Sequence, residues 1–173
     1  MAFYLAGHEC QAGAYHGATE ALFFSRGTSD LLADVSAICS QDLNRFFLHQ
    51  CIHGVGHGLM AWTSYEMLDA LELCDGLDTD QDRLSCYSGV FMENVVGGLS
   101  GSMGHTSEYL SDDLHFPCNV VEQRHVVHCY YYQTSRMLQL SGGDFQVVAK
   151  GCADAPEVAH VWCFLSMGRD VGG

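Results

Sequence analysis

The spacing of the cysteines constrains the fold of this chain more than any other feature of the sequence. The nine cysteines are Cys10, Cys39, Cys51, Cys74, Cys86, Cys118, Cys129, Cys152 and Cys163. Their separations alternate between long intervals of 23 to 32 residues and short intervals of 11 or 12 residues. Such an alternation is typical of an internal repeat, and its period of 34 to 43 residues has the length of a helix pair.

The chemistry of these cysteines follows from what surrounds them. Zinc sites use short CxxC or CxxxC pairs and c-type haem attachment uses CxxCH, and the sequence contains neither pattern. Disulfides formed in an oxidising compartment are the remaining simple explanation. We therefore expect an extracytoplasmic protein, which includes secreted, periplasmic and cell-surface proteins.

Helix start signals and helix breakers alternate along this cysteine frame. A start signal follows the first cysteine of each short interval: Ser40, Thr79 or Asp80, Asn119 with Glu122, and Asp154 with Pro156 and Glu157. Breakers lie near the middle of three long intervals, at residues 25–29, 97–104 and 141–144. The fourth midpoint falls at Trp62 and Thr63, where no strong breaker stands. Each short interval is therefore predicted to be the opening of a long helix.

Helix geometry then predicts the pairing. Cysteines 11 or 12 residues apart on one helix are separated by about 16 to 18 Å, whereas a disulfide needs Cα atoms within about 7 Å. A hairpin that turns at the middle of a long interval returns to the level of its first cysteine. The predicted pairs are Cys10 with Cys39, Cys51 with Cys74, Cys86 with Cys118, and Cys129 with Cys152. Cys163 is left over because its hairpin is cut off.

The predicted fold class is all-α, with tandem helical-hairpin repeats closed by disulfides in an α-solenoid or a compact αα-array. One helical-repeat domain is expected over residues 1–173, with units starting near residues 1, 40, 79, 119 and 154 and the last unit truncated. The truncation indicates a fragment or a short terminal unit. In general architecture the array resembles the Sel1-like cysteine-rich repeat proteins, but their motif spacing is absent and no family is assigned.

A glycine and histidine motif marks the first two units. The segments CQAGAYHG from Cys10 and CIHGVGHG from Cys51 share the pattern CxxGxxHG. Their glycines, four residues apart, are Gly13 with Gly17 and Gly54 with Gly58. A glycine inside a helix costs about 1 kcal/mol relative to alanine, so a reason must offset that cost. Close approach of another backbone is one explanation, and room for a ligand beside the helix is the other.

The histidines of these two units are candidate metal ligands. His49, His53 and His57 follow at four-residue steps and share one helix face, while His8 and His16 flank Cys10. Equivalent helices of neighbouring repeats usually lie side by side, so the five imidazoles are predicted to converge on a transition metal ion: copper, zinc or iron. Packing histidines, or an exposed pH-responsive face, are the alternatives.

Two functions follow from this pattern. The first is a metal-binding repeat domain or a metalloenzyme, in which an open coordination position allows water activation or redox chemistry and Glu20 or Glu93 serves as the base. The alternative is a non-enzymatic scaffold that binds a protein, a glycan or a small ligand. A formal charge of −14 disfavours nucleic acid as a partner. Membrane insertion is not expected, because no stretch of about 18 apolar residues without charge occurs.

Overall fold

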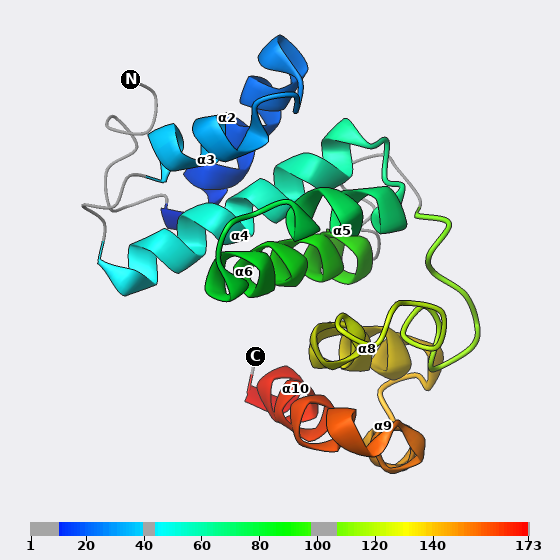
Figure 1. Cartoon of the computed structure of the whole chain (residues 1–173). Coiled ribbons are helices and arrows are strands. Elements are labelled where there is room, and N and C mark those ends of the chain that lie inside the picture. The colour runs from blue at the N-terminus through cyan, green and yellow to red at the C-terminus, as the bar shows by residue number, and fades with distance from the viewer. Residues whose placement is uncertain (1–10, 40–43, 98–106, 173) are drawn as a thin grey trace. The chain divides into compact units, whose positions relative to one another are not determined.

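The computed structural model describes residues 11–39, 44–97 and 107–172, and of residues 11–16 it describes the backbone only. Every regular element within these ranges is a helix (Figure 1), which confirms the all-α prediction. The chain divides into two compact units, residues 1–93 and 94–173, and each unit is described by itself. The single repeat domain over residues 1–173 stays a prediction.

The first unit is built around one long central helix. Its helices are α2 (Gln11–Arg26), α3 (Leu31–Ile38), α4 (Arg45–Trp62), α5 (Met67–Asp75) and α6 (Asp80–Met92). Helix α4 packs against both α2 and α6 (Figure 1). All residues from Cys51 to Met60 are buried, so this stretch of α4 is covered on every side.

Close contacts between glycines bring α4 and α6 together. A Cβ atom added at Gly89 would lie 2.0 Å from the carbonyl oxygen of His53, and one added at Gly56 would lie 2.2 Å from the carbonyl oxygen of Cys86. Real Cβ atoms almost never come closer than 3.0 Å to such an atom. On the α2 side, a Cβ at Gly58 would lie 3.1 Å from the backbone nitrogen of Glu20. The side chains of Thr19 and Phe23 lie closer still, at 2.9 and 3.0 Å, so close packing of α2 as a whole accompanies the glycine at position 58, whereas Gly17 has no such neighbour among the described residues.

The turns of this unit match the sequence signals in part. The side chain of Thr79 caps α6 by accepting a hydrogen bond from the backbone N–H of Asp82 at 3.1 Å, as predicted. Gly27, with a φ of 75°, follows α2 within the predicted turn at residues 25–29. The turn after Trp62 lacks a glycine, and Ser64 and Tyr65 adopt positive φ angles of 56° and 68° there. The predicted cap Ser40 lies outside the described residues.

The second unit begins within a π-helical turn, η1 (Glu93–Gly97), that follows α6 along the chain. Its further helices are α8 (Val126–Leu140), α9 (Phe145–Asp154), the short 3-10 helix η2 (Glu157–Ala159) and α10 (His160–Gly172). The start signal at Asn119 is wrong as a helix boundary, since α8 begins only at Val126. The predicted turn at residues 141–144 is confirmed, with positive φ angles at Gly142 and Gly143.

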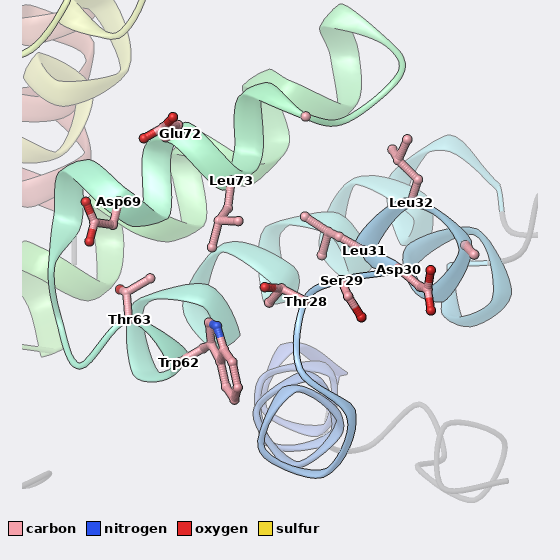
Figure 2. Close-up of a pocket in the computed structure, with 12 residues that line it drawn as sticks. Thr28, Ser29, Asp30, Leu31, Leu32, Trp62, Thr63, Asp69, Glu72 and Leu73 are labelled. Carbon is pink, nitrogen blue, oxygen red and sulfur yellow. The ribbon is translucent and has the colours of Figure 1, made fainter.

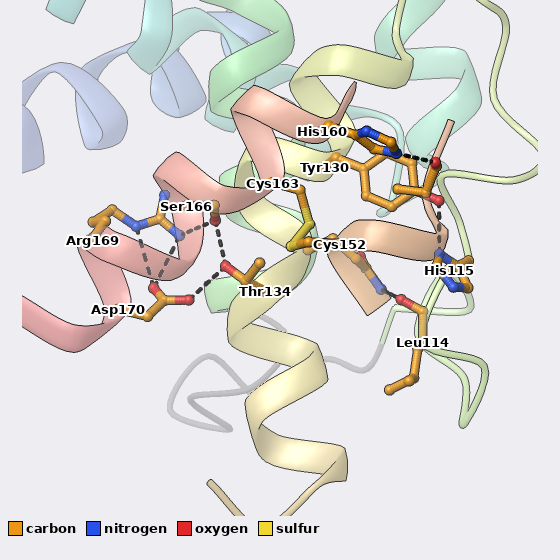
Figure 3. The surroundings of a disulfide bond; sticks show 12 residues. Leu114, His115, Tyr130, Thr134, Cys152, His160, Cys163, Ser166, Arg169 and Asp170 are labelled. Atoms are coloured by element: carbon orange, nitrogen blue, oxygen red, sulfur yellow. Dashed lines mark hydrogen bonds and ion pairs between the residues drawn. A yellow bond between two sulfur atoms is a disulfide. The ribbon is translucent and has the colours of Figure 1, made fainter. Parts of the chain in front are cut away.

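A polar cluster joins α8 and α10 beside a disulfide (Figure 3). Thr134 donates a hydrogen bond of 2.7 Å to Asp170 and also contacts the hydroxyl of Ser166. The guanidinium of Arg169 donates to the carboxylate of Asp170 and, at 3.1 Å, to the backbone carbonyl of Tyr131. Because Thr134 and Ser166 are fully buried, these bonds satisfy polar groups that would otherwise destabilise the helix interface.

The predicted disulfide connectivity is wrong. The bonds join the cysteines across the short intervals: Cys39 with Cys51, Cys74 with Cys86, Cys118 with Cys129, and Cys152 with Cys163. The predicted pairs across the long intervals are therefore absent for these eight cysteines, and Cys163 is bonded rather than left over. Cys10 lies outside the described residues.

The error has a geometric cause, which is that the short intervals are not helical throughout. Cys74 lies in the last turn of α5, a tight turn follows, and Cys86 lies near the middle of α6. Reversal of the chain within the interval brings the two Cα atoms to 5.7 Å, where a continuous helix of that length would hold them about 18 Å apart. Each disulfide thus ties the end of one helix or turn to a position inside the next helix.

Candidate functional site

The candidate site lies on the face of α4 that carries the histidine row. The ring centroids of His49 and His53 are 6.0 Å apart, and those of His53 and His57 are 4.8 Å apart. The four-residue spacing therefore places the three rings in one row, as the sequence predicts. His53 and His57 are buried, while His49 is partly exposed at one end of the row.

The most closely coupled groups of the site are His53, His57 and Glu93. The Nε2 atoms of the two histidines are 3.1 Å apart. On the opposite side of the His57 ring, Nδ1 lies 2.6 Å from Oε2 of Glu93. If Glu93 is a carboxylate it accepts the Nδ1–H proton, so neutral His57 has its lone pair on Nε2, directed at His53. Glu93 therefore fixes both the orientation and the tautomer of His57.

Tyr65 and Glu20 complete the surroundings of this pair. Burial, together with the smaller effect of the negative charges of Glu93 and Glu20, raises the pKa of Tyr65 to about 12. Both carboxylates therefore lie within electrostatic reach of the Tyr65 hydroxyl. Since the tyrosine stays protonated at neutral pH, it presents an O–H donor near two acids. The sequence did not single out Tyr65, because it follows the end of α4 in a turn that has no breaker signal.

His49 has a different partner from the other two histidines. Its Nδ1 lies 2.8 Å from the hydroxyl oxygen of Ser85, and that hydroxyl donates a hydrogen bond to the carbonyl of Gln81. Nδ1 of His49 is therefore the donor in its contact with Ser85. Burial lowers the pKa of His49 from its ordinary value. With Arg45 and Asp82 it lines a small cavity of about 220 Å³.

The structure brings together only part of the predicted ligand set. His53 and His57 meet, and Glu93, one of the two candidate bases, contacts His57 directly. His8 lies outside the described residues, and for His16 the backbone alone is described, within α2. Among the residues that the structure describes, no group of three or more His, Cys, Asp or Glu side chains is arranged to hold a metal ion.

Comparison with known proteins adds no assignment. No protein family matches the chain, and neither curated proteins nor solved structures give a match. None of the described helices is both long enough and apolar enough to cross a membrane. Four disulfides in a helical protein are typical of proteins that fold in an oxidising compartment.

Proposed function

We propose that this protein is an extracytoplasmic helical domain that binds a transition metal ion, copper, zinc or iron, through His53 and His57. The observation that supports the proposal is the distance of 3.1 Å between the two Nε2 atoms. Two imidazole nitrogens that bind one tetrahedral ion at about 2.0 to 2.1 Å each are about 3.3 Å apart. Small rotations of the two rings would therefore admit an ion between them.

Glu93 has the role that a carboxylate commonly plays behind a metal-binding histidine. Such histidines usually donate their second ring N–H to a carboxylate or a carbonyl, which fixes the ring and makes the ligating nitrogen more basic. The contact of 2.6 Å between Nδ1 of His57 and Oε2 of Glu93 has this arrangement. Because Glu93 is engaged with His57, Glu20 is the candidate that remains for a general base.

Two histidines alone bind an ion weakly, so the proposal requires further ligands. The sequence offers His8 and His16, which are the other members of the predicted set. With three protein ligands, an ion would keep an open position for water, which is the arrangement of catalytic rather than structural zinc sites. A metalloenzyme that activates water, with Glu20 as the base, is the enzymatic form of this proposal.

Metal analysis of protein purified without a nickel column tests the proposal. The chelated protein is offered copper, zinc and ferrous iron in turn at pH 7 and pH 5, and the ion retained per chain is counted by mass spectrometry. We expect about one ion per chain at pH 7 and loss at pH 5, because protonated imidazole cannot bind it. Retention of none of the three ions would overturn the proposal.

Substitutions identify the ligands. His53→Ala and His57→Ala should each abolish retention, and Glu93→Gln should weaken affinity about 10- to 100-fold through the orientation of His57. His160→Ala is the matched control, because it removes a histidine of the second unit whose partner is the carbonyl of Ala155. If the His53 variant loses stability equally with and without the ion while retention persists, the two histidines are packing residues.

A non-enzymatic scaffold in a repeat array is the second candidate, and one recurring contact favours the array. His57 stands six residues after Cys51, and Ser135 stands six residues after Cys129. Each contacts an acidic residue that stands seven residues after the equivalent cysteine of the next unit, which is Cys86 for His57 and Cys163 for Ser135. These acids are Glu93 for His57 and Asp170 for Ser135. The same pair of positions thus joins α4 to the residue that follows α6, and α8 to α10, as expected for successive repeats.

A further inference from the structure

An open groove in the first unit is distinct from the histidine pair. It lies between the start of α3, the end of α4 and one face of α5 (Figure 2), and its volume is about 810 Å³. That volume lies within the range of about 300 to 1,000 Å³ found for ligand sites. None of the residues lining it belongs to the group of His53, His57 and Glu93.

Trp62 gives the groove a fixed aromatic wall. Its indole meets the ring of Phe24 edge to face at a centroid distance of 6.1 Å. Gly27 lies behind it, where an added Cβ atom would be 3.8 Å from Cη2 of the indole. These neighbours hold the half-buried side chain in place on the α2 side. The ring therefore needs little further ordering when a ligand binds against it.

The groove combines apolar side chains with acidic ones. Leu31 and Leu73 point into it in Figure 2. Asp30, Asp69 and Glu72 also line it, and all three carboxylates are exposed. The described residues that line the groove include neither lysine nor arginine, so its charge is negative throughout. Its charge has the same sign as the formal net charge of −14, and both attract cations.

We propose that this groove binds a basic peptide segment of a partner protein, in which arginine or lysine alternates with apolar residues. A guanidinium or ammonium group can stack on the face of Trp62 while the acidic rim neutralises its charge. The intervening apolar side chains pack on Leu31 and Leu73. A bare metal ion fits the groove poorly, because its carboxylates lie on the rim and its inner surface is leucine and indole.

Tryptophan fluorescence reports directly on this groove. The chain has two tryptophans, so a Trp162→Phe variant leaves Trp62 as the only one. The probe is an acetylated and amidated peptide, Arg-Leu-Arg-Leu, and the matched control peptide is Glu-Leu-Glu-Leu. We expect a saturable fluorescence change with the basic peptide that weakens as salt is added, and none with the acidic peptide. Absence of saturable binding by the basic peptide overturns the proposal.

Two charge-neutralising double variants separate the groove from general charge attraction. Asp69→Asn with Glu72→Gln should weaken binding about tenfold, since two exposed ion pairs are lost. Asp154→Asn with Glu157→Gln makes the same change of net charge at exposed positions of the second unit and should leave binding unchanged. Equal weakening by both double variants would mean that only net charge attracts the peptide, and it too would overturn the proposal.

Discussion

Replacing Gly89 by alanine should separate α4 from α6 and thereby destabilise both the fold and the histidine pair. The added Cβ would meet the backbone carbonyl of His53 and would lie 3.0 Å from the Cα atom of Gly56. Both neighbours are backbone atoms, so no side-chain rotation can relieve the overlap and the helices must move apart. The contacts of His49 with Ser85 and of His57 with Glu93 span the same interface.

The expected loss of unfolding free energy in Gly89→Ala follows from two opposing contributions. Overpacking in a well-packed interface costs about 1 to 3 kcal/mol, and here the upper end applies because only whole helices can move. Alanine in a helix is favoured over glycine by about 1 kcal/mol, which offsets part of that cost. The net loss of unfolding free energy should be about 2 kcal/mol, or about 4 to 8 °C in Tm for a chain of this size.

Gly17→Ala is the matched control, because Gly17 lies within α2 and a Cβ added there meets no atom of the described residues within 4 Å. This variant has the higher helix propensity of alanine without a steric overlap, so it should stabilise the protein by about 1 kcal/mol. Urea unfolding of both variants without reductant, followed by circular dichroism, measures the difference of about 3 kcal/mol that these two terms imply. Metal retention should fall in the Gly89 variant alone. A Gly89→Ala protein as stable as the control would refute the close backbone contact on which this reasoning depends.

Two further predictions concern the second unit. Burial and the nearby charge of His125 lower the pKa of His128 from 6.5 to about 4. The unfolded chain therefore binds the proton first as the pH falls, and the folded state should lose stability between pH 6.5 and pH 4. This loss of unfolding free energy should be about 3 kcal/mol larger in the wild type than in His128→Gln. Equal losses for the two proteins in unfolding titrations across this pH range would contradict the prediction. Replacing Cys152 and Cys163 together by alanine should cost about 3 kcal/mol in the same assay, since an 11-residue loop is no longer closed, and a non-reducing peptide map that joins Cys152 to Cys129 would contradict the pairing itself.

The sequence predicted the helices of the candidate site better than its contacts. The four-residue histidine spacing correctly placed His49, His53 and His57 in one row, because helix periodicity is a local property. It could not predict that His49 would bond Ser85 while His57 bonds Glu93, since those partners are 36 residues away on another helix. The position of Tyr65 depends on two successive positive φ angles in a turn that its residue types do not favour.

Patterns along the chain are enough to predict the all-helical class, the disulfide-bonded cysteines and the turns that contain glycine, because periodicity, residue chemistry and backbone preference act over a few residues. Which cysteines pair depends instead on how the helices pack. The same spacing of 12 residues suits a continuous helix or two helices joined by a tight turn, and the choice depends on packing. In the segment from Cys74 to Cys86, the turn lets both cysteines become fully buried between α5 and α6. Burial against a neighbouring helix stabilises the chain by more than a continued helix would, and no local rule contains that neighbour.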